Sequence, residues 1–396
     1  MNRLRVTHAT LGAGLFSNGV WDMLSILVPL YAVAVGMSAA EIGLIVAARS
    51  VLPAALSIHG GILMDRLGIR RVVLWVAIAT ALLPLAYPSS GGFFTLIVLQ
   101  LLLGLASGLA MAGAQTWSLQ SSGGDTAALA QFSIASRIGT FIGPVMVGAV
   151  WDWLGAWAAF ACISLLACGL IACASSGAPA PGALPAARVR ILAELMPRWS
   201  DHVSAVALAA IPAVAFILMV AFLRNGPGGI QASFYVVYLG DAGLSGTIIG
   251  ALIGLSEFAG VIGSLLAAAT ERLVRPHLLL IGCIAVSIVA IAATPLIAQF
   301  LVLLMAAAIV RGVSQGVSQP VMYSLIFKAV PTEVQGAIVG LRNTVTRLAS
   351  IVTPTVMGVA AGIWGLGASF YLIGFLLLLG CAAIVVPARK IFDAPG

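Results

Sequence analysis

The chain has 396 residues, of which 61% are hydrophobic and only 8% are charged. Soluble domains are about 25% charged, so this composition excludes a soluble globular protein. The net charge is +7, but no basic tail or basic patch interleaved with aromatic residues occurs, and we expect no nucleic-acid partner. The apolar runs are long and continuous, which favours a bundle of helices in a lipid bilayer over a barrel of short alternating strands.

Windows of about 20 apolar residues predict twelve membrane-spanning helices. Their approximate ranges are 9–35, 41–63, 72–88, 93–117, 127–150, 156–175, 206–239, 243–269, 277–297, 299–325, 336–361 and 367–387. The longest stretch outside these runs, 176–205, is rich in Pro, Ala and Arg. It predicts a cytoplasmic linker between an N-terminal six-helix bundle, 1–175, and a C-terminal one, 206–396.

The two halves repeat each other, because matching residues recur at offsets that drift slowly between 206 and 210. The pairs are Asn18–Asn225, Gly43–Gly250, Asp65–Glu271, Gly104–Gly312, Gly108–Gly316, Arg137–Arg347, Pro144–Pro354 and Gly148–Gly358. Parallel six-helix repeats joined by a linker are an architecture of secondary transporters, with the substrate site between the halves near mid-membrane. The sequence therefore predicts an all-α, polytopic membrane protein.

Basic residues gather on one side of the predicted helices. Thirteen of the 19 lysines and arginines fall there, namely Arg3, Arg5, Arg66, Arg70, Arg71, Arg188, Arg190, Arg198, Arg272, Arg275, Lys328, Arg389 and Lys390. The opposite loops hold only Glu41, Asp152 and Asp241. Basic loops face the cytoplasm, so both termini are predicted to be cytoplasmic.

Eight charged residues fall within the predicted spans: Asp22, Arg49, Arg137, Arg224, Glu257, Arg311, Arg342 and Arg347. Each costs roughly 2.5–3.5 kcal/mol at a helix centre, so we expect them to face a water-filled cavity or one another. Arg137 and Arg347 occupy equivalent positions and are interpreted as scaffold or gating residues. Arg342 is set aside, because it falls near a helix end. The remaining charges have no charged counterpart in the other half, which favours a role toward substrate or coupling ion: Asp22, Arg49, Arg224, Glu257 and Arg311. The alternative is structural pairing, such as Asp22 with Arg49.

Helical spacing extends this polar lining. Asn18 shares a helix face with Asp22, Gln231 with Arg224, and Gln315 with Arg311. The predicted substrate and ion-binding residues are Asp22, Arg49, Arg224, Glu257, Arg311, Asn18, Gln231 and Gln315. The Pro-Gly-Gly run at 227–229 softens its helix and is a candidate hinge.

Six arginines and two acids in the spans leave a formal excess of positive charge. A dry cavity cannot hold that excess uncompensated, and arginine suits carboxylate or phosphate groups. We therefore expect a substrate with negative charge or strong oxygen acceptors. Asp22 and Glu257, the only acids within the spans, are the candidate proton carriers.

No catalytic pattern accompanies these charges. The five cysteines lie inside apolar runs without metal-ligand spacing, and no Ser/His/Asp set, HExxH or phosphate loop occurs. We expect no enzyme activity, no cofactor and no metal.

The charged link Gly61, Asp65, Arg66, Gly68, Arg70 and Arg71 resembles the loop 2–3 signature of the major facilitator superfamily. Gly139, Gly143, Pro144 and Gly148 are similar to the helix 5 signature of that family's antiporters. Together they resemble the twelve-helix drug and metabolite efflux branch. The family's helix 4 pattern has an arginine where this chain has Gln100, so the resemblance supplies no proton-handling arginine there.

The resemblance implies that the loop helps to close the cytoplasmic gate. The expected gating residues are Gly61, Asp65, Arg66, Gly68, Arg70, Arg137, Gly143, Pro144 and Arg347. It also implies a monomer in the bacterial cytoplasmic membrane that exports a small organic molecule by alternating access, with the proton as coupling ion, and the arginines within the spans favour an anion as that molecule. The alternatives are a proton-coupled importer of an organic anion and, from another class, a membrane-embedded enzyme or sensor.

Overall fold

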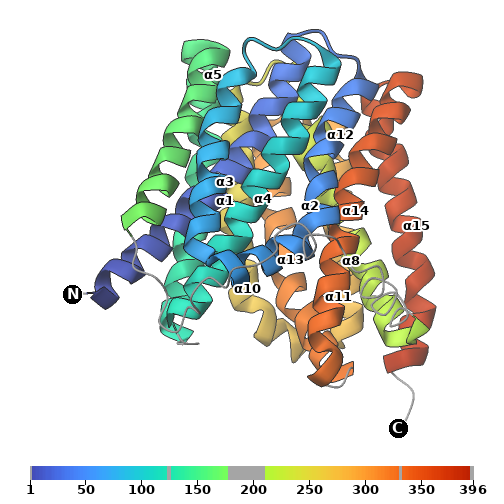
Figure 1. Cartoon of the computed structure of the whole chain (residues 1–396). Helices are drawn as coiled ribbons and strands as arrows, with labels where there is room; N and C mark the ends of the chain where they lie inside the picture. Colours follow the sequence, from blue (N-terminus) through green and yellow to red (C-terminus); the bar gives the residue numbers. More distant parts are fainter. Residues whose placement is uncertain (1, 123–125, 177–209, 330–331, 393–396) are drawn as a thin grey trace. The chain divides into compact units, whose positions relative to one another are not determined.

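The computed structural model describes residues 2–122, 126–176, 210–329 and 332–392, and every element in these ranges is helical (Figure 1). The elements are α1 (Asn2–Ala34), α2 (Ala39–Leu67), α3 (Ile69–Leu82), η1 (Leu83–Ala86), α4 (Phe93–Ser122), α5 (Thr126–Ser176), α8 (Pro212–Ile230), η3 (Gln231–Tyr235), α9 (Val236–Asp241), α10 (Gly246–Glu271), α11 (Pro276–Ala292), α12 (Thr294–Ile297), α13 (Leu301–Ala329), α14 (Thr332–Trp364) and α15 (Leu366–Phe392). Of the predicted linker 176–205, all but its first residue lies outside the described residues.

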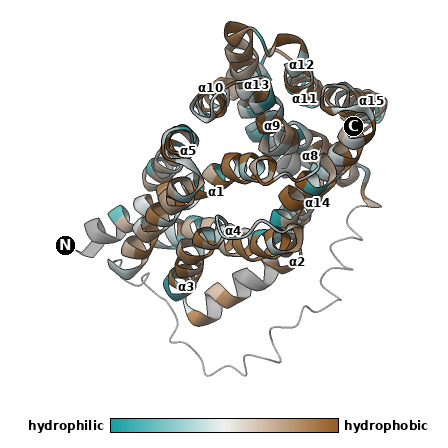
Figure 2. Cartoon of the chain, turned by 90° about the horizontal axis from the view of Figure 1, so that it is seen from above, coloured by the Kyte–Doolittle hydropathy of each residue, from teal (hydrophilic) through white to brown (hydrophobic). Residues whose placement is uncertain are grey.

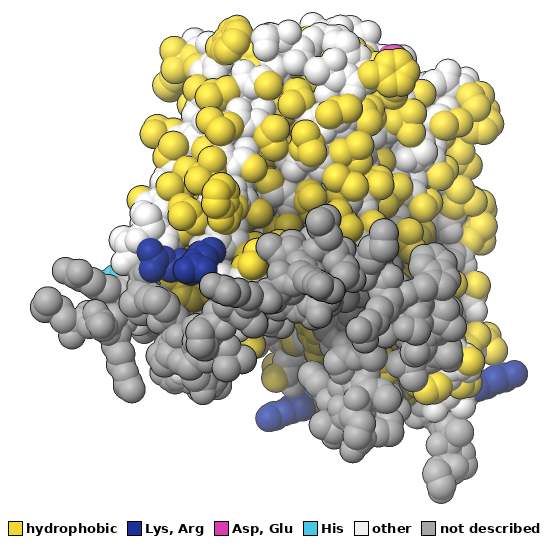
Figure 3. Space-filling view, viewed as in Figure 1, with side chains coloured by type: hydrophobic (Ala, Val, Ile, Leu, Met, Phe, Trp, Pro, Cys, Tyr) yellow, Lys and Arg dark blue, Asp and Glu magenta, His cyan; other side chains and the backbone are white. Residues whose placement is uncertain are grey.

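Ten helical stretches in the described ranges are long and apolar enough to cross a membrane. One of them, α5, contains two spans, because Gly155 adopts a φ of 77° and breaks the helix between the predicted spans 127–150 and 156–175. The shorter apolar helix α11 completes the predicted set of twelve. The prediction of an all-α polytopic membrane fold is therefore confirmed. Brown, hydrophobic residues dominate the helices in Figure 2. Yellow, hydrophobic side chains are spread over the described part of the face seen in Figure 3, and dark blue Lys and Arg appear only in its lower part.

The chain divides into two compact units. Unit 1 comprises Met1–Met37, Ala48–Pro197 and Leu244–Gly254, and unit 2 comprises Ser38–Ala47, Arg198–Gly243 and Leu255–Gly396. In unit 1, α5 packs against α1 and α3, and α4 packs against α1 and α3. In unit 2, α11 packs against α13 and α15, and α14 packs against α8 and α15.

Each unit contains a short segment that is distant in sequence from the rest. In unit 2 the start of α2 meets α14, where a Cβ on Gly43 would lie 2.5 Å from the Pro354 carbonyl oxygen. In unit 1 the start of α10 meets α5, where a Cβ on Gly250 would lie 2.7 Å from the Pro144 carbonyl carbon. The two contacts are counterparts of each other, because the sequence repeat pairs Gly43 with Gly250 and Pro354 with Pro144.

The charged link between α2 and α3 is shorter than the sequence suggested. Helix α2 continues to Leu67 and α3 begins at Ile69, so the turn is Gly68 alone. Its φ of 86° lies in the left-handed region, which glycine enters without the steric cost of a Cβ. Met64 and Val73, on either side of this turn, belong to a buried hydrophobic cluster that also includes Trp117.

The predicted helix over 206–239 is continuous in its described part but not uniform. It runs from α8 through the five-residue π-helix η3 into α9. Pro227 lies inside α8 and removes one backbone donor shortly before the π-helix starts. Single π-turns inside α-helices are frequent at functional sites, so the irregularity marks this segment for attention.

Candidate substrate and coupling site

The predicted site residues fall into two groups, one in each unit, and the first is organised by a helix crossing. In unit 1, Gly104 of α4 presses on the backbone of α2 at Arg49: a Cβ on Gly104 would lie 2.7 Å from the Arg49 carbonyl carbon. Only a residue without a side chain allows this approach. The Arg49 side chain, 6% exposed, places its guanidinium carbon 3.6 Å from the centre of the Trp21 ring and donates to the Trp21 carbonyl.

The same crossing occurs in unit 2 between α10 and α13. A Cβ on Gly312 would lie 2.9 Å from the Ser256 carbonyl carbon, and Gly312 and Ser256 are the repeat counterparts of Gly104 and Arg49. Here the arginine comes from the other helix. Arg311, 5% exposed, donates from Nη2 to Ser256 Oγ at 2.6 Å.

Each unit thus buries one arginine at the same glycine crossing, but on the opposite helix of the pair. In unit 1 the arginine is on the helix that meets the glycine, and in unit 2 it directly precedes the glycine. A buried guanidinium requires hydrogen-bonding or charged partners, because desolvation of the charge is costly. The recurrence indicates that the glycine crossing in each unit accommodates a buried positive charge.

A second arginine of unit 2 is committed to neighbouring helices. Arg224 of α8 donates from Nε to Ser318 Oγ at 2.8 Å and from Nη2 to the Gln315 carbonyl at 3.0 Å and Gln319 Oε1 at 3.2 Å. Gln315 returns a bond from Nε2 to the Arg224 carbonyl and another to Ser287 Oγ, both at 3.0 Å. Arg224 and Gln315, which were predicted as separate binding residues, therefore meet in a reciprocal tie between α8 and α13 that also reaches α11.

Asn225 anchors the next position of α8 on the opposite side. Its Nδ2 donates to the Thr346 carbonyl at 2.9 Å and to Ser350 Oγ at 2.7 Å, both on α14. Arg224 and Asn225 together fix α8 to two helices immediately before Pro227 and the π-helix. This arrangement is compatible with the predicted hinge at 227–229, since the segment before it is held and the segment after it is irregular.

Glu257 lies on α10 beside Ser256 and is half-buried. Its charge interacts with both Arg311 and Arg224. Tyr235 of η3, whose phenol is neutral, lies within electrostatic range of Arg311. Unit 2 therefore brings Arg224, Glu257 and Arg311 within electrostatic range of one another.

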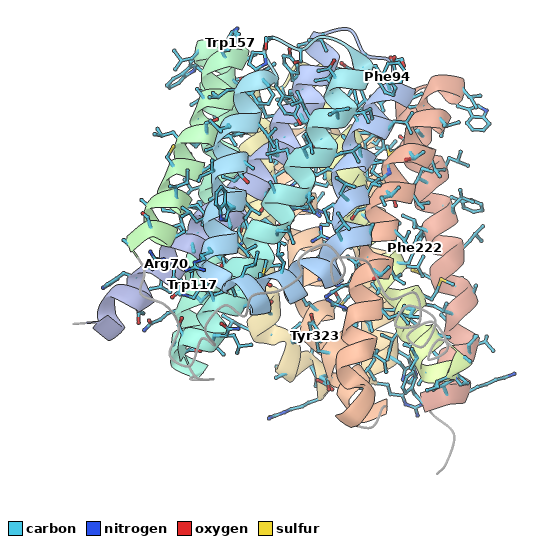
Figure 4. The ribbon with its side chains drawn as sticks, viewed as in Figure 1. Arg70, Phe94, Trp117, Trp157, Phe222 and Tyr323 are labelled. Carbon is cyan, nitrogen blue, oxygen red and sulfur yellow. The ribbon has the colours of Figure 1, made fainter. Side chains whose placement is uncertain are left out.

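A third arginine joins the edge of this cluster. The Arg342 guanidinium carbon lies 4.7 Å from the centre of the Tyr323 ring, which Figure 4 labels on α13. Arg342 also donates to Asn343 Oδ1 at 2.6 Å, and its charge acts on Arg224.

The other predicted binding residues have simpler surroundings. Asp22 is half-buried and follows Trp21, the residue that Arg49 contacts. Asn18 donates from Nδ2 to the Gly14 carbonyl of its own helix at 2.8 Å. Gln231 is buried and begins the π-helix. In the described residues no group of three or more His, Cys, Asp or Glu side chains could hold a metal ion.

Among the predicted gating residues, Arg70 has the clearest contacts. Its Nε donates to the Ala174 carbonyl at 2.7 Å and its Nη2 to the Ser175 carbonyl at 2.9 Å, both in the last turn of α5. Arg70 therefore caps a helix C-terminus, where a cation is favoured by the unpaired carbonyls and the helix dipole. In Figure 4 Arg70 and Trp117 lie toward one end of unit 1, and Phe94 and Trp157 lie at the other. Gly61, Asp65 and Arg66 are in α2, but their side chains lie outside the described residues.

The helix 5 signature is a packing surface. A Cβ on Gly143 would lie 2.9 Å from the Gly19 carbonyl oxygen of α1, and Pro144 meets Gly250. Arg137, which precedes this surface on α5, and its repeat counterpart Arg347 are both half-buried.

Sequence reasoning missed some partners of the arginines described above. Trp21 carries no pattern that links it to Arg49. Ser287 is one serine in an apolar helix. Ser256 had a signal, because it is the repeat counterpart of Arg49, but its contact with Arg311 required the crossing geometry.

Comparisons with known proteins agree with this architecture. The family model described as Major Facilitator Superfamily matches residues 10–269 and 217–393. No curated protein sequence matches the chain. Among solved structures, a mutant form of the nucleoside transporter NupG is similar, with a TM-score of 0.79 at 16% identity over 96% of this chain and 99% of that one.

Two further solved structures have the same fold. A bacterial homolog of the human lysosomal transporter Spinster, inward-facing and unoccupied, has a TM-score of 0.76 at 12% identity over 98% of both chains. A POT family transporter in complex with 5-aminolevulinic acid has a TM-score of 0.74 at 11% identity over 99% of this chain and 100% of that one. Because the family model matches nearly the whole length of the chain, the chain belongs to the major facilitator superfamily, and the long apolar helices of its described residues agree with that family.

Proposed function

We propose that the chain exports a small organic solute with negative charge or strong oxygen acceptors, by alternating access and in exchange for protons. Arg311 carries the proposal. It is a nearly fully buried guanidinium in a membrane helix, with one hydrogen-bond partner, Ser256, among the described residues. A bound anionic group would offset the cost of that charge, and the planar guanidinium binds carboxylate or phosphate with two parallel bonds.

The remaining residues are assigned roles around it. Arg49 supplies the equivalent charge in unit 1, and Asp22 and Glu257 are the proton carriers. Asn18, Arg224, Gln231 and Gln315 complete the binding surface, with Arg224 and Gln315 holding α8 in place.

Alternation between the two access states is assigned to the loop and the helix 5 surface. The gating residues are Gly61, Asp65, Arg66, Gly68, Arg70, Arg137, Gly143, Pro144 and Arg347. We further propose that the chain acts as a monomer in the bacterial cytoplasmic membrane, with both termini and the linker 176–205 in the cytoplasm. The halves 1–175 and 206–396 are the two moving bodies.

Three features support the small-solute and export parts. The similar solved structures include a nucleoside transporter and a transporter in complex with 5-aminolevulinic acid, both of which handle small organic molecules. The Gly139-to-Gly148 pattern is similar to that of the family's antiporters. Glu257 provides a titratable group within electrostatic reach of Arg311.

The test is transport in inverted membrane vesicles whose acidified lumen is monitored with a pH-sensitive dye, with a panel of organic anions and cations. Addition of a transported anion should release protons from the lumen, and Asp22→Asn or Glu257→Gln should abolish the release. If both variants keep full coupling, the proton mechanism is wrong. A preference for lipophilic cations would refute the anion assignment, and anion movement together with protons would favour the importer.

A further inference from the structure

Arg311 has hydrogen-bond donors that are not used by the described residues. Its Nη2 is bonded to Ser256 Oγ, but Nε and Nη1 donate to none of the described residues. Arg224, by contrast, already uses Nε and Nη2 on three acceptors from α13. Arg311 is therefore the arginine of this cluster that can accept a ligand without breaking a tie between helices.

Glu257 is the carboxylate that accompanies Arg311 in this cluster. It accepts no hydrogen bond from the part of the chain that the structure describes, and it is half-buried beside Ser256. The charged and titratable groups that act on this pair are Arg224 from α8 and Tyr235 from η3, with Tyr323 and Arg342 acting on Arg224. None of these is an acid, so Glu257 is the single carboxylate among them.

The direction in which protonation of Glu257 changes the affinity for the ligand restricts the chemical class of that ligand. If the ligand were only an anion on Arg311, protonation of Glu257 would remove a competing negative charge and strengthen binding. Proton and ligand would then bind together and travel in the same direction. Exchange requires the reverse, in which a proton on Glu257 weakens ligand binding.

We propose that Glu257 and Arg311 form a recognition site for a zwitterion: the ligand's carboxylate or phosphate binds Arg311, and its ammonium group binds Glu257. The ammonium and the transported proton then compete for the same carboxylate, which makes exchange a consequence of the site. This inference rests on the proposed function, because it takes exchange as the mode of transport, and it specifies the substrate class.

The experiment measures binding to the purified full-length protein with two matched sets of probes. One set is phenylalanine, 3-phenylpropanoate and 2-phenylethylamine; the other is leucine, 4-methylpentanoate and 3-methylbutylamine. Within a set the skeleton is shared and only the charged groups differ. In at least one set the zwitterion should bind about 10- to 100-fold more tightly than either relative, as expected for one charge-assisted hydrogen bond.

Two variants assign the charges. Glu257→Gln should bind the zwitterion and the carboxylate equally, and Arg311→Gln should bind the zwitterion and the amine equally. In the unaltered protein the zwitterion's dissociation constant should rise as the pH falls, and Glu257→Gln should remove this dependence. Asp241→Asn, an exposed acid at the end of α9, is the control and should keep full selectivity. Unliganded melting temperatures establish that each variant is folded.

If the carboxylate probe binds as tightly as the zwitterion, or if no probe of either set binds, the zwitterion site is refuted. Proton release on addition of another organic solute with negative charge or strong oxygen acceptors in the vesicle assay would still uphold the proposed function. Selective zwitterion binding without proton release would uphold the site and refute exchange.

Discussion

Substitution of Gly104 by alanine tests the helix crossing that positions Arg49. The new Cβ would lie 2.7 Å from the Arg49 carbonyl carbon and 2.8 Å from its Cα, whereas ordinary contact begins at 3.4 Å. Because the obstructing atoms are backbone, no side-chain rotation relieves the clash. The Arg49 carbonyl oxygen lies closer still, so helices α2 and α4 must move apart, and such overpacking costs about 1–3 kcal/mol.

The alanine also brings a benefit that the experiment has to remove. Alanine is favoured over glycine in a helix by about 1 kcal/mol. Gly282, on α11, provides the matched control, since a Cβ there meets nothing within 4 Å. Gly282→Ala gains the helix preference without the clash, so the difference between the two variants isolates the steric cost.

The assay is thermal unfolding of the purified proteins in one detergent, at one scan rate, followed by tryptophan fluorescence. Gly104→Ala should melt several degrees below Gly282→Ala. Gly312→Ala should show a loss of similar size, because its Cβ would lie 2.9 Å from the Ser256 carbonyl carbon. Equal melting temperatures for Gly104→Ala and Gly282→Ala would show that the two helices do not approach as closely as described.

Three smaller perturbations have defined outcomes in the same assay. Arg70→Ala removes two bonds to the last turn of α5 and should cost about 1–2 kcal/mol, with Arg70→Lys intermediate; no change would mean that water caps the end of α5 equally well. Asp152→Ala removes the acceptor of the Gly246 and Thr247 amides at the start of α10 and should cost about 0.5–2 kcal/mol, whereas Asp241→Ala should be neutral. Gly68→Ala places a Cβ at a φ of 86° and should cost about 1–2 kcal/mol, against no loss for Gly91→Ala, which has open space and no positive φ.

Much of the fold could be predicted from the sequence, because each membrane-spanning helix corresponds to a long apolar run of residues. The break near Gly155 and the change of element after Leu67 both fell close to the expected positions. The repeat also pairs Gly104 with Gly312 and Arg49 with Ser256 from the sequence alone. What hydropathy does not contain is the rotation of each helix about its axis, and therefore which residues meet across a crossing.

The site shows the same limit. Helical spacing put Gln315 and Arg311 on one face, but Gln315 turned out to bond the Arg224 carbonyl and Ser287, while Arg311 bonds Ser256. Such pairings depend on side-chain reach between helices far apart in sequence. The placement of Trp21 over Arg49 is another case, since a tryptophan in an apolar run carries no signal of a cation above its ring.

The contacts made by the starts of α2 and α10 form at different times during synthesis of the chain. Gly250 of α10 docks on Pro144, which the ribosome has made about a hundred residues earlier. Gly43 of α2 needs Pro354, which emerges about three hundred residues later. At about 5–20 residues per second, the start of α2 waits on the order of 15–60 s for its partner. The start of α2 therefore gains this contact only after α14 has been made. A chain arrested before α14 leaves the surface of α2 around Gly43 without its partner.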